Sequence, residues 1–129
     1  MPYMQHLKVL VADDTSVSRM LLVDALSQIG IRNVTLAGDG EQALKSMMAS
    51  PCHIVFSDFN MPKLDGLQLL RALREYGPTS KTVFILVSGK GDKAVIEAGK
   101  KFGLNNFLLK PFTVPGLKTC IEAVVGKLV

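Results

Sequence analysis

Three aspartates, one serine and one lysine in this 129-residue chain have the chemistry needed to accept a phosphoryl group. Each lies at the end of a short apolar run: Asp13, Asp14, Asp58, Ser88 and Lys110. A carboxylate can act as a covalent nucleophile toward phosphorus, and Asp58, inside the run SDFNMP, is the best placed. Phosphoryl transfer otherwise needs mainly positioning and charge neutralisation, which a hydroxyl and an ammonium group supply.

The three aspartates also predict a metal site. Carboxylates brought close together resist ionisation unless a cation lies between them. Mg²⁺ suits such a place because it binds one or two carboxylates, keeps several waters and often takes phosphate oxygens. Simpler roles exist for single members: Asp14 could cap the first helix, as could Thr15 or Ser16, and Lys110 could be a surface lysine extending into water. Capping does not explain Asp58 at the end of a hydrophobic strand.

The elements that must position these residues follow from alternating apolar runs and helical patterns. We expect strands at residues 7–12, 33–37, 53–57, 82–87 and 106–109, each followed by a helix. The first helix should bury Val17, Leu21, Ala25, Leu26 and Ile29. Five strand–helix units predict an α/β fold, a doubly wound (βα)5 parallel sheet with helices on both faces. Such sheets bind ligands at the carboxyl ends of their strands, where the five candidate residues lie.

The charge and composition of the chain limit the classes of partner that it can bind. The net charge of +4 comes from residues 88–129, where seven lysines outnumber three acidic residues. Such a basic end can dock an acidic partner or can be an ordinary solvated face. No aromatics alternate with these lysines, so we expect no nucleic-acid binding. The chain shows neither a membrane-spanning apolar run nor a signal peptide, so we expect a cytoplasmic protein with reduced Cys52 and Cys120.

A family resemblance rests on four motifs in order. They are VADD at 11–14, SDFNMPKLDG at 57–66, LVSG at 86–89 and FLLKPF at 107–112. Together they resemble the receiver domain of two-component response regulators, with the spacing of single-domain chemotaxis regulators of the CheY type. The resemblance covers essentially the whole chain, so residues 1–129 are expected to form one receiver domain. It implies a flavodoxin-like sheet with strand order 2-1-3-4-5.

The resemblance also implies a role for each candidate residue. Asp58 would be the phosphoacceptor, and the metal ligands would be Asp13, Asp14, Asp58 and the backbone carbonyl of Asn60. Ser88 and Lys110 would contact the phosphoryl group, and the Lys110–Pro111 peptide bond would be cis. Such a protein is a phosphoacceptor that catalyses its own phosphorylation and dephosphorylation, rather than an enzyme with another substrate.

The expected partner upstream is a sensor histidine kinase of the chemotaxis type. Since no residues follow Val129 to form an output domain, a monomer would signal by protein contact, to the flagellar motor switch. The alternative is a phosphate sink or phosphorelay intermediate for the same kinase. A Mg-dependent aspartate phosphatase of the haloacid dehalogenase type would need an acid where Asn60 stands. A flavodoxin would need a hydroxyl-rich loop where Asp13 and Asp14 stand.

Two positions depart from the chemotaxis pattern. Phe107 occupies the aromatic switch position, where chemotaxis regulators typically carry tyrosine, and it is either a switch moving together with Ser88 or a plain core residue. Lys90 stands two residues after Ser88, where the best-known chemotaxis member has an acidic residue. With Asn60, Lys90 would tune the lifetime of the phosphoryl group.

Overall fold

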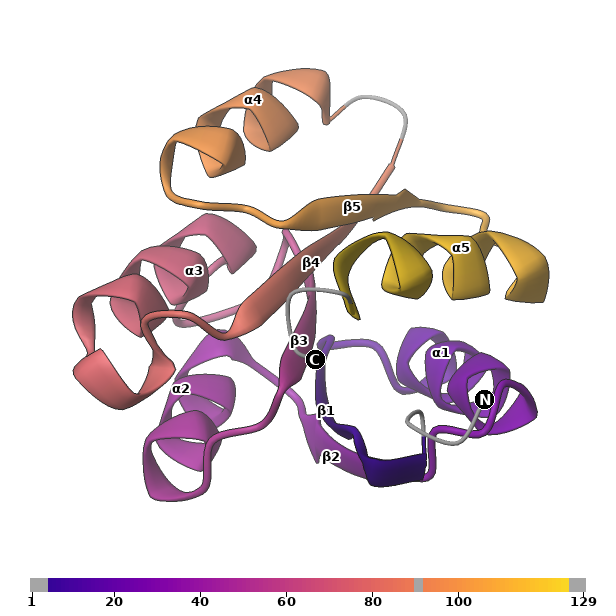
Figure 1. Ribbon diagram of the computed structural model, residues 1–129. Helices are drawn as coiled ribbons and strands as arrows, with labels where there is room; N and C mark the ends of the chain where they lie inside the picture. Colours follow the sequence, from indigo (N-terminus) through magenta and orange to yellow (C-terminus); the bar gives the residue numbers. More distant parts are fainter. Residues whose placement is uncertain (1–4, 90–91, 126–129) are drawn as a thin grey trace.

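The computed structural model describes residues 5–89 and 92–125. It has a five-stranded parallel sheet in the order β2-β1-β3-β4-β5, which confirms the predicted fold class and strand order (Figure 1). The strands are β1 (Lys8–Ala12), β2 (Asn33–Ala37), β3 (Ile54–Asp58), β4 (Val83–Ser88) and β5 (Asn106–Leu109).

Helices cover both faces of the sheet. They are α1 (Ser16–Gln28), α2 (Gly40–Ala49), α3 (Gly66–Glu75), α4 (Lys93–Lys101) and α5 (Val114–Val125), with a 3-10 turn η2 (Gly77–Thr79) after α3. Helices α1 and α5 pack on one face, and α2, α3 and α4 pack on the other (Figure 1). The helical pattern of the sequence predicts a last helix from Val114 to Leu128, and residues 126–129 lie outside the described residues.

The central strands separate two apolar cores. Ile54 and Phe56 of β3 face α1 and α5, whereas Val55 faces α2 and α3, because successive side chains of a strand point to opposite faces. All three side chains are fully buried, as are most of their neighbours on β1 and β4. Burial on both faces explains the continuous apolar runs that predicted these strands.

The apolar face predicted for α1 is partly wrong. Leu22, Ala25 and Leu26 are buried, whereas Val17 and Leu21 are 68% and 62% exposed. At 100° per residue, Val17 and Leu21 lie well around the helix from the side that Leu22 and Leu26 present to the sheet. The helix has more apolar residues than its buried face can hold, so composition did not distinguish core from surface.

The strand register brings the candidate residues to one edge. Ala12 pairs with Ser57, and Asp58 pairs with Val87. Ser88 in turn pairs with Leu109, the residue before Lys110. The carboxyl ends of β1, β3, β4 and β5 therefore lie at one edge of the sheet, because all the strands run in the same direction.

Candidate functional site

Three aspartates form the centre of the site. One carboxylate oxygen from each of Asp13, Asp14 and Asp58 lies within 4.8 Å of the other two. Asp13 is buried, Asp58 is half-buried and Asp14 is exposed. Three oxygen ligands at this spacing fit a hard divalent cation such as Mg²⁺, and the repulsion among them gives the protein a reason to bind one.

Asp13 is held rigidly by its surroundings. Its carboxylate Oδ1 accepts a hydrogen bond from the Thr15 backbone N–H at 2.9 Å, and its own N–H donates to the Ala37 carbonyl at 3.1 Å. The Arg19 guanidinium donates to the Asp13 carbonyl at 2.6 Å. Asp14 meets the Thr15 hydroxyl at a long 3.5 Å, so its carboxylate can turn toward a cation. Of the three candidates for the N-cap of α1, the structure shows Thr15, so the capping role considered for Asp14 is wrong.

Asp58 ends β3 beside a positive charge. Its Oδ1 lies 3.4 Å from Lys110 Nζ and accepts the Phe59 backbone N–H at 2.9 Å. Burial raises the pKa of Asp58 above its ordinary value, and Lys110 opposes that rise more strongly than Asp13 adds to it. The Asp58 carboxylate has thus lost water on burial, and the nearby Lys110 charge compensates only part of that loss.

Ser88 ends β4 with a buried hydroxyl. The side chain is 1% exposed, and among residues 5–89 and 92–125 its Oγ has no hydrogen-bond partner. Buried hydroxyls are nearly always paired, because an unpaired one loses its bonds to water without replacement. A phosphoryl oxygen bound at Asp58 would be a partner for it.

Lys110 connects two of the aspartates. Its ammonium lies 3.9 Å from Asp13 Oδ2 as well as 3.4 Å from Asp58, so it points into the site rather than into bulk solvent. Its backbone N–H donates to the Ser88 carbonyl at 2.8 Å, which fixes β5 against β4 at this edge. The Lys110–Pro111 peptide bond is cis, as predicted.

The remaining predicted residues surround this centre. Asn60 is exposed in the loop two residues after Asp58, and Phe107, on β5, is 37% exposed. Lys90 lies outside the described residues. Sequence reasoning considered Thr15 only as a helix cap and missed Arg19, yet both hold Asp13 in place. Arg19 is a polar residue near the start of a helix, and no motif distinguished it from surface residues.

The sequence from residue 9 to 122 matches the family model of the response regulator receiver domain. The chain belongs to this family. It is 48% identical over 124 residues to a probable chemotaxis protein CheY of Rhizobium etli, covering 96% of each chain. Neither the family model nor this relative supports the aspartate phosphatase or the flavodoxin alternative.

Solved receiver structures share the fold. CheY4 of Vibrio cholerae matches with a TM-score of 0.84 and 27% identity, covering 92% of this chain and 98% of that one. The receiver domain of a sensor histidine kinase from Pseudomonas aeruginosa, solved with a magnesium ion in its active-site cleft, also gives a TM-score of 0.84. Its identity is 26%, over 93% of this chain and 98% of that one.

In the part of this chain that the structure describes, no helix is long and apolar enough to cross a membrane.

Proposed function

We propose that residues 1–129 form one cytoplasmic, monomeric receiver domain that accepts a phosphoryl group on Asp58 from a chemotaxis-type histidine kinase. The observation that supports this most directly is the convergence of Asp58 with two further aspartates, the Lys110 ammonium and the Ser88 hydroxyl, which has no hydrogen-bond partner within residues 5–89 and 92–125. The family match and the chemotaxis name of the Rhizobium etli relative point the same way.

In the transfer step, a carboxylate oxygen of Asp58 attacks the phosphorus of a phosphohistidine. The new O–P bond forms as the N–P bond breaks, and the electron pair of that bond leaves with the imidazole. The signal ends by hydrolysis: water attacks the phosphorus and the O–P bond to Asp58 breaks, releasing inorganic phosphate. The chain itself supplies the nucleophile for the first step and the surroundings for both.

Each neighbour of Asp58 has a distinct role in this scheme. Lys110 neutralises charge on the transferred oxygens, and Ser88 donates its hydroxyl to one of them. Asp13, Asp14, Asp58 and the Asn60 carbonyl would hold Mg²⁺, which when bound offsets negative charge on the carboxylates and the phosphoryl group. Asn60 and Lys90 would set the lifetime of the phosphoryl group.

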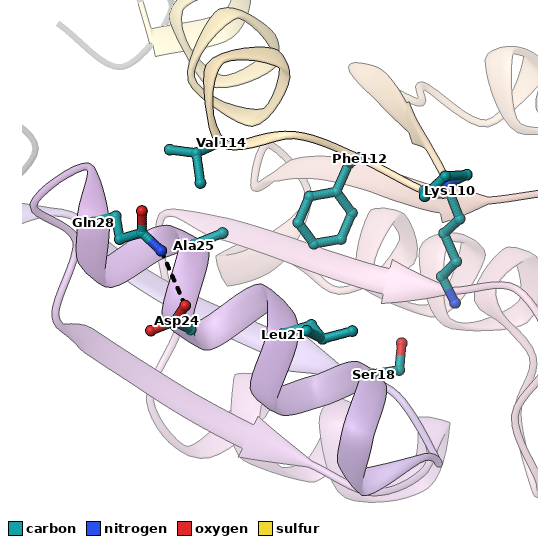
Figure 2. Close-up of a pocket in the computed structure, with 9 residues that line it drawn as sticks. Ser18, Leu21, Asp24, Ala25, Gln28, Lys110, Phe112 and Val114 are labelled. Atoms are coloured by element: carbon teal, nitrogen blue, oxygen red, sulfur yellow. Dashed lines mark hydrogen bonds between the residues drawn. The ribbon is translucent and has the colours of Figure 1, made fainter.

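A groove beside the site is suited to the donor protein. It has a volume of about 500 Å³ and lies between α1 and the segment after β5, with Lys110 at one end (Figure 2). Leu21 and Phe112 give it apolar walls. An apolar segment of the kinase seated here would bring a phosphohistidine to Asp58, and the exposure of Leu21 would then serve binding.

The output is protein contact on the surface around α4, β5 and α5, directed to the flagellar motor switch. Phe107 is partly exposed there, beside exposed lysines of α4 and α5 that would attract an acidic partner. In the phosphorylated protein Ser88 would move toward the new oxygens, and Phe107 would turn into the space behind it. A phosphate sink would have the same chemistry without this binding.

The chemistry is tested by incubating the protein with acetyl phosphate and Mg²⁺ and measuring its intact mass. The wild type should gain one phosphoryl group, and Asp58→Asn should gain none because an amide is not a nucleophile here. Unchanged wild-type mass, or equal modification of the variant, would refute the proposal.

The output is tested with a peptide from the motor switch protein. Phe107→Ala should still be phosphorylated, and its phosphorylated form should bind the peptide more weakly than the wild type. If the phosphorylated wild type shows no binding, the motor-switch output is refuted and the phosphate-sink alternative is favoured.

A further inference from the structure

The loop that joins β3 to α3 contains a strained turn. Lys63 has a backbone φ of 71°, a value that residues other than glycine rarely adopt. The Leu64 N–H donates to the Pro62 carbonyl at 2.8 Å, two residues back. A positive φ inside such a bond has the features of the classic γ-turn, which is rare and strained. Strained backbone persists only where the surrounding structure holds it.

The start of α2 supplies that support. A Cβ atom added to Gly40 would overlap the Leu64 carbonyl oxygen and lie 2.5 Å from the Leu64 Cβ. The backbone of the turn therefore rests directly on Gly40. The preceding residue, Asp39, accepts the Gln42 N–H at 2.8 Å, and its other carboxylate oxygen lies 3.9 Å from Lys63 Nζ. Two neighbouring residues of one helix start thus contact two neighbouring residues of the turn.

The same loop includes Asn60, and the residues on either side of it are fixed by further contacts. At its base, the Gly66 N–H donates to the Phe59 carbonyl at 2.8 Å. On the other side of Asn60, Met61 is buried in the core formed with α2 and α3. A shift of the turn at residues 62–64 would be transmitted through these few residues to the backbone of Asn60.

We propose that Gly40 is a positioning residue for the metal pocket, holding the strained turn so that the Asn60 carbonyl faces the aspartates. The inference rests on the proposed function for the identity of the pocket, but the contact itself does not. Because any side chain at position 40 would displace Leu64, the site requires glycine there even though it opens a helix.

The test compares Gly40→Ala with Gly38→Ala. A Cβ at Gly38 meets its nearest atoms at ordinary distances of 3.6 and 3.7 Å, so this variant is a matched control two residues away. Gly40 is not among the glycines with positive φ, so alanine fits its backbone and favours the helix. A defect in Gly40→Ala would therefore come from the contact with Leu64.

Two readouts are needed. By calorimetric titration, Gly40→Ala should bind Mg²⁺ about tenfold more weakly, as with other changes that misplace metal ligands, whereas Gly38→Ala should match the wild type. In metal-free protein, amide hydrogens of residues 59–65 should exchange faster in Gly40→Ala alone. Circular dichroism confirms that both variants are folded.

If Gly40→Ala does not fold, Asp39→Asn replaces it. This variant keeps the α2 cap, since asparagine caps as well as aspartate, and loses only the charge facing Lys63. Asp39→Asn should also weaken Mg²⁺ binding and speed amide exchange in residues 59–65, but by less than Gly40→Ala. Wild-type exchange and Mg²⁺ affinity in the folded variant would overturn the positioning role. A wild type that binds no Mg²⁺ would refute the proposed function instead, and the exchange measurement would still decide the role of Gly40.

Discussion

Among the described residues, polar groups at the two ends of the sheet differ in how fully they are hydrogen-bonded. At the carboxyl end, three aspartates crowd together and the Ser88 hydroxyl has no partner among the described residues. At the amino end of β4 and β5, the half-buried Arg74 guanidinium donates to four oxygens. They are the carbonyls of Ser80, Thr82 and Gly103 and the side-chain oxygen of Asn105, at 2.7 to 3.1 Å.

Hydroxyl groups show the same contrast. Thr79, at the amino end, is fully buried and donates to the Leu73 carbonyl at 2.7 Å. Ser88 is equally buried, and its hydroxyl has no partner within the described part of the chain. One end therefore uses its polar groups for stability, and the other leaves them available for a ligand. The difference gives a general criterion: in a parallel sheet, unmet polar groups at the strand ends mark the functional edge.

The largest effect on stability is expected at the amino end. Arg74→Ala should lower the free energy of unfolding by about 2–3 kcal/mol, because hydrogen bonds to a charged donor are lost from four acceptors. Urea unfolding measures it, with Arg71→Ala as the control. Arg71, one turn earlier on α3, lies 5.1 Å from the Phe102 ring centroid, a contact worth about 1 kcal/mol or less. Equal losses in the two variants would show that the four bonds contribute little.

The second prediction pairs the two hydroxyls. Ser88→Ala should change the free energy of unfolding by less than about 0.5 kcal/mol, since it removes a hydroxyl that has no partner among the residues that the structure describes. Thr79→Val should cost about 1–2 kcal/mol. Ser88→Ala should slow phosphorylation by acetyl phosphate roughly tenfold or more, because a donor to the transferred oxygens is lost. Thr79→Val, measured as folded protein, should be phosphorylated at the wild-type rate. The reverse pattern would contradict the division of roles.

The smallest effect concerns the pH dependence of stability. Burial raises the pKa of Asp58 in the folded protein, so between its unfolded and folded pKa values the folded state binds more protons. Ionised Asp58 therefore destabilises the metal-free fold above its folded pKa. Asp58→Asn should unfold at higher urea than wild type at pH 7, and the gap should shrink as the pH falls through that pKa. A gap that is constant with pH would place its origin elsewhere.

Most of the fold was predictable because its signals are local. Buried parallel strands such as β4 are continuous apolar runs, and topology then places Asp58, Ser88 and Lys110 at one edge. The supporting contacts were not predictable. The bond from Arg19 to the Asp13 carbonyl and the contact of Gly40 with Leu64 depend on how loops meet in space, and neither residue type reveals such a meeting. The exposure of Val17 and Leu21 escaped prediction because an exposed apolar residue has the same composition signal as a buried one.

We expect a divalent cation to complete the carboxyl edge of the sheet. The direct test measures the free energy of unfolding of wild type and Asp14→Asn by urea, with Mg²⁺ added and with a monovalent salt matched in ionic strength. Asp14 suits this test because its carboxylate is exposed and makes little structural contact. Wild type should gain about 2.7 kcal/mol at a hundredfold excess of Mg²⁺ over its dissociation constant, and Asp14→Asn should gain much less. A wild type indifferent to Mg²⁺, or a variant that responds equally, would contradict the account.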